Sequence, residues 1–86
     1  MPTISSFFGI AVRMYFDDHP PPHFHVYYES SSAIVAIDSL EIISGSLPRR
    51  ALALVVEWAI AHRPELREDW DLCVRHAALK PIEPLK

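Results

Sequence analysis

A cluster of histidines stands beside a run of prolines in the first third of the chain. Three of the five histidines, His19, His23 and His25, fall within one short stretch. The prolines at 20–22 fix φ and cannot continue a helix or a central strand, so we expect a stiff connection there. Because alternate residues of a strand share one face, His23 and His25 should point to the same side. Two histidines held on one face by a rigid connection are typical of a binding or catalytic site.

Metal binding is the first chemistry that these histidines could support. His23 and His25, together with Asp17, Asp38 or His19, would supply imidazole and carboxylate ligands suited to zinc, manganese or iron. A His-x-His pair is also common by chance, and no second spaced pair of ligands follows it. We therefore expect no cofactor and keep a divalent transition metal as an alternative.

Recognition of a macromolecule is the second chemistry. Alternation along paired strands predicts one open sheet face that carries a set of polar side chains: Arg13, Tyr15, His23, His25 and Tyr27. Such a face offers rings for stacking and positive charge for phosphate, to which Arg49 and Arg50 could add. The net charge of −3 does not favour bulk attraction to nucleic acid, so a partner protein is at least as well supported as RNA.

Acid–base catalysis is the third chemistry. Asp17 or Asp38 could orient His23, which would leave His25 or Tyr15 as a proton donor. The sequence shows no obvious nucleophile, since Cys73 lies on the apolar stripe of an expected helix. The alternative function is thus a small metal- or histidine-dependent hydrolase, such as a ribonuclease. A purely structural interpretation also stands: the histidines would satisfy backbone groups in a tight loop.

The elements that must position these residues are strands in the first half of the chain. Residues 9–16 and 23–29 alternate between apolar and polar side chains, and residues 33–38 are rich in β-branched types. A brief fourth strand could follow at 40–43. We predict a three- or four-stranded antiparallel meander over about residues 9–43.

The pairing register follows from keeping the apolar faces together. It places three pairs opposite each other: Phe16 with Phe24, Met14 with Val26, and Val12 with Tyr28. In that register Tyr15 lies beside His25, and Asp17 and Asp38 flank His23.

The second half of the chain is helical in pattern. Helices are expected over about 47–62 and 64–78, with Ser46 as an N-cap and prolines in the first turns. The tail, 80–86, contains two prolines and should be extended and loosely held. Strands followed by helices predict an α+β domain spanning 1–86, with the helices packed on one sheet face.

Composition narrows the function classes. Half of the 86 residues are hydrophobic and 22% are charged, which is typical of a globular chain. A single cysteine excludes an internal disulfide and suits a reducing compartment. There is no long apolar run of the kind that spans a bilayer. We expect a cytoplasmic protein with no membrane association, as a monomer or homodimer.

A set of short motifs resembles one bacterial family along essentially the whole chain. The motifs are Met1-Pro2-Thr3-Ile4-Ser5, Phe8-Gly9, Met14-Tyr15, His19-Pro20-Pro21-Pro22-His23-Phe24-His25, Leu47-Pro48-Arg49-Arg50-Ala51-Leu52, Glu57-Trp58, His62-Arg63 and Trp70. The family is the domain of unknown function 4160. Where its members usually have acidic or glycine residues after the aromatic pair, this chain has Glu29 and then three serines, which affects only a turn.

The resemblance implies a small prokaryotic protein and carries over no reaction, cofactor or catalytic residue. Members are often encoded beside another short protein of a second uncharacterised family, an arrangement similar to toxin–antitoxin pairs. The resemblance therefore implies a binding module that forms one half of a two-protein system, with a partner encoded by an adjacent gene.

Overall fold

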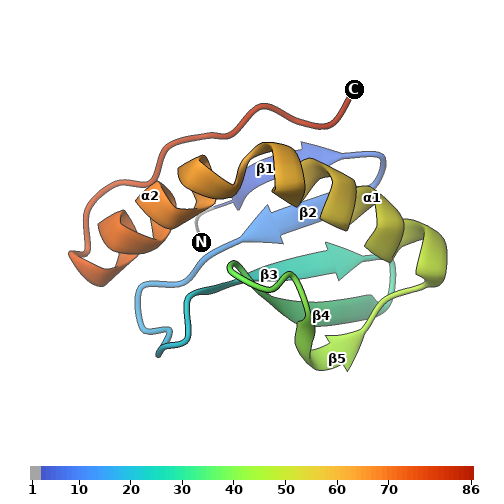
Figure 1. The fold of residues 1–86 in the computed structure, drawn as a ribbon, viewed down its shortest axis with the longest axis horizontal. Helices are drawn as coiled ribbons and strands as arrows, with labels where there is room; N and C mark the ends of the chain where they lie inside the picture. Colours follow the sequence, from blue (N-terminus) through green and yellow to red (C-terminus); the bar gives the residue numbers. More distant parts are fainter. Residues whose placement is uncertain (1–2) are drawn as a thin grey trace.

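Residues 3–86 are described by the computed structural model, and they form a sheet followed by two helices (Figure 1). The strands are β1 (Thr3–Phe7), β2 (Ile10–Arg13), β3 (His23–Tyr28), β4 (Ser31–Ala36) and β5 (Ile42–Ser46). They pair antiparallel in the order of the sequence. The helices are α1 (Arg49–Ala61) and α2 (Arg63–Val74). Neither helix is long and apolar enough to cross a membrane.

The predicted α+β class is confirmed, but the predicted number of strands is too small. The sheet has five strands, because Thr3–Phe7 adds one before the predicted meander. Its sequence, Thr-Ile-Ser-Ser-Phe, does not alternate regularly between apolar and polar residues. The neighbours Ile4 and Ser5 are both buried, because the pairing register shifts after Thr3. The last strand begins at Ile42 and not at residue 40, and it continues to Ser46.

The helices are shorter than the predicted 47–62 and 64–78. Ser46 ends β5 and is not an N-cap; Pro48 occupies the cap position, without a side-chain hydrogen bond. The second helix ends at Val74, and His76, with φ of 56°, lies in the left-handed region. A residue in that region cannot continue the helix to 78.

Both helices lie on one face of the sheet (Figure 1). Val12, Val26 and Val35 from three neighbouring strands are completely buried, as are Val55 and Trp58 of α1. These residues belong to one hydrophobic cluster that joins the sheet to both helices. Within residues 3–86 no helix covers the opposite sheet face, so side chains such as His25 and Tyr27 stay partly exposed there.

The predicted register is wrong by two residues. Val12 pairs with Val26 and not with Tyr28, and Arg13 lies opposite His25. The sidedness was nevertheless predicted correctly, since a shift of two residues leaves every side chain on the same face. The structural reason is that β2 ends at Arg13, so that residues 14–16 leave the sheet and do not pair.

The C-terminal tail is extended but, contrary to the prediction, it is firmly packed. The N–H of Ile82 donates a 2.8 Å hydrogen bond to the carbonyl of Ile4, and the Ile82 side chain is buried. The indole Nε1 of Trp58 donates to the carbonyl of Glu83 at 2.8 Å. The tail therefore closes the edge of the core beside β1.

A buried carboxyl group joins the tail to α2. Asp69 is almost inaccessible, and its Oδ1 accepts a 2.8 Å hydrogen bond from the backbone N–H of Lys80. Its Oδ2 has no hydrogen-bond partner among the residues described. Burial raises the pKa of this carboxyl group, and the Lys80 N–H offsets part of the effect.

The raised pKa predicts how stability depends on pH. An acid that binds its proton more tightly in the folded state stabilises the fold at low pH, and this contribution is lost as pH rises through the folded pKa. We expect the free energy of unfolding of Asp69→Asn to increase relative to that of the wild type as the pH is raised from about 4 to about 7. Urea denaturation across this range measures the difference. Parallel stability curves for the two proteins would contradict the prediction.

Candidate functional site

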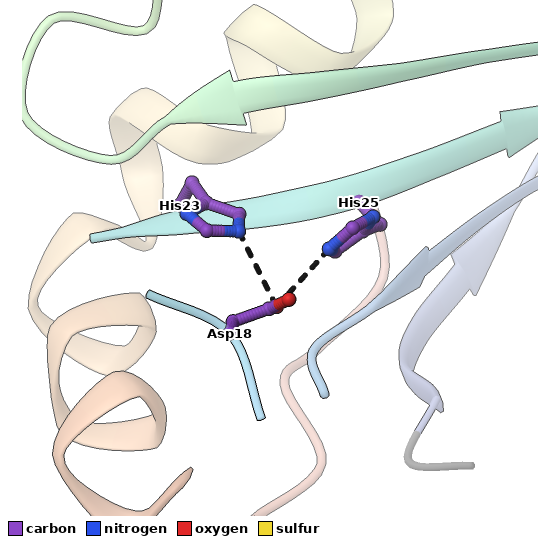
Figure 2. A group of neighbouring side chains, drawn as sticks. All are labelled: Asp18, His23 and His25. Carbon is purple, nitrogen blue, oxygen red and sulfur yellow. Dashed lines mark hydrogen bonds and ion pairs between the residues drawn. The ribbon is translucent and has the colours of Figure 1, made fainter. Parts of the chain in front are cut away.

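The site is centred on one carboxylate oxygen that contacts two imidazoles (Figure 2). Asp18 Oδ2 lies 3.0 Å from His25 Nε2 and 3.3 Å from His23 Nε2. The three side chains are between 10% and 17% exposed, so they are shielded from water but not sealed from it. Within residues 3–86 they are the group of ligand-type side chains close enough together to hold a metal ion. We call them the Asp18–His23–His25 group.

Local sequence explains how these three residues meet. His23 opens β3, and His25, two residues on, shares its face. Asp18 stands on the connection from β2, in a turn where its N–H donates to the carbonyl of Tyr15 at 3.1 Å. Its Oδ2 in turn accepts the N–H of Tyr15 at 3.3 Å. The turn and the following prolines thus hold the carboxylate against the start of β3.

Neighbouring groups fix the two imidazole rings. The Nδ1 of His23 lies 2.7 Å from the carbonyl of Pro21, and its ring packs 5.1 Å from the ring of Trp70 in α2. The ring of His25 stands edge-on to Tyr15 at 4.6 Å. Both rings are therefore oriented before any ligand arrives.

A second group of polar side chains continues from His25 across the open sheet face. The hydroxyls of Tyr15 and Tyr27 are 2.6 Å apart, and the guanidinium of Arg13 lies 5.1 Å from the centre of the Tyr27 ring. Arg13 Nε also donates to Thr3 Oγ1 at 3.1 Å. We call Arg13, Tyr15, His25 and Tyr27 the open-face cluster.

The hydrogen bond between the tyrosines has an electrostatic consequence. The hydrogen bond between the Tyr27 and Tyr15 hydroxyls and, after it, burial raise the pKa of Tyr27 above its ordinary value. The Tyr27 hydroxyl therefore stays protonated at neutral pH and can serve as a hydrogen-bonding group.

A shallow hollow of about 160 Å³ lies beside the open-face cluster. It runs from His25 and Tyr27 past Ile34 to Gly45 on β5. Gly45 has φ of 79°, and a Cβ there would lie 2.3 Å from the carbonyl oxygen of Ser32. Glycine thus lets β5 approach β4 closely and leaves the floor of the hollow free of a side chain.

The predicted site residues fall into two sets. The structure brings together the five residues of the predicted face, Arg13, Tyr15, His23, His25 and Tyr27, although His23 is mostly covered. It does not bring Asp17 or Asp38 to His23 and His25, which contact Asp18. Asp17 lines a hollow with His19 and His76, which Asp18 also lines, and Asp38 forms an exposed ion pair with Arg67. Arg49 and Arg50 are exposed at the start of α1, in the helical layer.

Asp18 is the functional candidate that the sequence analysis missed. The alternation that favoured Asp17 assumed a strand up to residue 16, but the strand ends at Arg13. In the turn that follows, alternation no longer decides which side chain faces the histidines. The sequence does show two adjacent acidic residues, Asp17 and Asp18, before the histidines. Only the geometry of the turn determines that Asp18 is the one that contacts them.

Cys73 is buried, as predicted, and is not a candidate nucleophile. Burial raises the pKa of its thiol to about 11, so the thiolate is scarce at neutral pH.

Comparison with known proteins gives one match. The family model described as a domain of unknown function (DUF4160) matches residues 9–71, a range that holds β2 to β5, α1, most of α2 and the whole Asp18–His23–His25 group. No curated protein matches the chain. No solved structure matches it either.

Proposed function

The chain belongs to the DUF4160 family, and we propose that it is a cytoplasmic binding module that recognises a small partner protein through its open sheet face. In this proposal it forms one half of a two-protein system similar to toxin–antitoxin pairs. One observation carries the proposal. The sheet face without helices bears an ordered cluster of Arg, Tyr and His side chains that hold one another in place.

Pre-organisation supports a binding role. An Arg or Tyr side chain that is already immobilised loses less conformational entropy on binding than a mobile one. Arg13 is held over Tyr27 and by Thr3, and Tyr27 is held by Tyr15. Tyr and Arg are also enriched among the residues that dominate the energy of protein interfaces. The neighbouring hollow at Ile34 and Gly45 offers a place for a partner side chain.

Charge favours a protein over RNA as the partner. The chain carries a net charge of −3, and Arg49 and Arg50 lie in the helical layer, away from the open-face cluster. A surface that binds RNA unspecifically needs several basic groups along one face. The open-face cluster supplies one arginine. The resemblance to the family points to a short protein encoded by an adjacent gene.

Calorimetric titration of that neighbouring protein into this one tests the proposal. We expect a stable complex in which the two chains are present in a ratio of one to one. A single-stranded RNA titrated in the same way serves as the comparison. Binding of RNA without binding of the neighbouring protein would show that the partner is RNA and not a protein. Binding of neither would contradict the proposal.

A second candidate function rests on the Asp18–His23–His25 group. A carboxylate that orients two histidines can support acid–base or metal-assisted hydrolysis, and a ribonuclease is the form that fits a toxin-like system best. This function requires turnover, which the binding module does not. Cleavage of RNA that disappears in His25→Ala would favour it over the binding module.

A further inference from the structure

We infer that the Asp18–His23–His25 group is a binding site for one divalent transition-metal ion. The ligands are Asp18 Oδ2, His23 Nε2 and His25 Nε2. His25 belongs both to this group and to the open-face cluster, but a metal titration without the partner protein tests this inference separately from the proposed function.

The contacts of His23 turn its Nε2 atom toward Asp18. The carbonyl of Pro21 can only accept, so the 2.7 Å contact fixes the proton of His23 on Nδ1. In the neutral ring, Nε2 then presents a lone pair. That lone pair faces Asp18 Oδ2 at 3.3 Å, and the carboxylate oxygen presents lone pairs as well. A metal ion bound between the two atoms would be coordinated by both lone pairs.

The spacing of the three atoms fits a metal ion. With metal–ligand bonds of about 2.0–2.2 Å, neighbouring ligand atoms lie about 3.4 Å apart in a tetrahedral shell and about 3.0 Å apart in an octahedral one. The two distances from Asp18 Oδ2 are 3.0 and 3.3 Å. All three ligand atoms lie within 4.8 Å of one another. Small rotations of the side chains would complete the coordination.

The surroundings resemble those of metal-binding histidines. Such a histidine usually donates its other ring N–H to a carbonyl or carboxylate, which fixes the tautomer, as Pro21 does for His23. Trp70 and Tyr15 hold the two rings from the sides. The three side chains keep 10% to 17% of their surface exposed, so the group is in contact with solvent.

The donor set indicates the class of ion. Two imidazoles and one carboxylate suit zinc, iron(II), manganese, cobalt or nickel better than magnesium or calcium, which prefer oxygen ligands alone. Three protein ligands leave at least one position open, as in sites that bind water or substrate.

Titration of metal-stripped, tag-free protein with zinc, manganese, cobalt or nickel salts tests the inference. We expect calorimetry to show one ion per chain for at least one of these metals. An ion at about 100 times its dissociation constant should raise the melting temperature by about 10 °C or more. Absence of both heat and shift with all four metals would overturn the inference.

Paired variants show whether the three residues are the ligands. Asp18→Asn and His25→Ala should weaken binding by at least about tenfold. Asp17→Asn and His19→Ala, which change the same residue types outside the group, should leave it unchanged. His23 is buried, so its variant is not used, and circular dichroism must show that the other variants are folded. Equal loss in both pairs would contradict the assignment.

Discussion

Replacing Trp58 with alanine is expected to lower the free energy of unfolding by about 3–5 kcal/mol. The Trp58 side chain is fully buried in α1, and its ring lies 5.3 Å from that of Phe7 and 6.1 Å from that of Phe24. It thus fills the space between the helix and two strands. Its indole N–H also donates to the carbonyl of Glu83, so the substitution frees the tail as well. A loss of this size removes much of the stability of an ordinary small domain, about 5–15 kcal/mol.

Two further variants separate the causes of that loss. Trp58→Phe keeps most of the apolar contact and removes the hydrogen bond to the tail, so it should cost about 1–2 kcal/mol. Ile60→Ala changes an exposed residue of the same helix and should stay within about 0.5 kcal/mol of the wild type. Urea denaturation followed by circular dichroism measures all three proteins. A loss below about 1 kcal/mol for Trp58→Ala would show that the helix does not depend on this contact.

Binding of the partner protein should depend on the side chains of the open-face cluster. We expect Tyr27→Ala and Arg13→Ala each to weaken binding of the partner protein by at least about tenfold, or about 1.4 kcal/mol. Tyr27→Ala removes the ring beneath Arg13 and the hydroxyl that contacts Tyr15, so it disorders the whole cluster. Because the cluster lies outside the core, the melting temperature should change by only about 2–4 °C. Calorimetry and thermal melting give the two quantities.

The matched controls are Tyr27→Phe and Ile60→Ala. Tyr27→Phe keeps the ring under Arg13 and loses only the bond to Tyr15, so its effect should be smaller than that of Tyr27→Ala. Ile60→Ala alters the helical layer and should leave the affinity unchanged. If affinity and melting temperature fall together in the open-face variants, the cluster is structural and the proposed interface is wrong.

The sequence predicted the faces of the sheet better than its pairing. Alternation in residues 9–16 and 23–29 assigns each side chain to a face, and a register error of two residues does not change that assignment. This is why Tyr15, His25 and Tyr27 were grouped correctly although Val12 pairs with Val26 and not with Tyr28.

Features outside regular elements could not be predicted from periodicity. Asp18 reaches the histidines through a turn, and no alternation describes a turn. The tail was expected to be loose because it contains two prolines, yet the hydrogen bond from Ile82 to Ile4 and the one from Trp58 to Glu83 hold it. Both depend on contacts between distant segments. Local sequence carries little information about such contacts.

Methyl NMR of the isoleucines during titration with the partner protein tests the central claim most directly. Ile34 lines the hollow beside the open-face cluster, whereas Ile60 is exposed on α1, in the layer on the opposite sheet face. We expect the Ile34 methyl signal to shift or broaden as the partner is added, while the Ile60 signal stays in place. A shift at Ile60 with an unchanged Ile34 signal would place the partner on the helices and contradict recognition through the open sheet face.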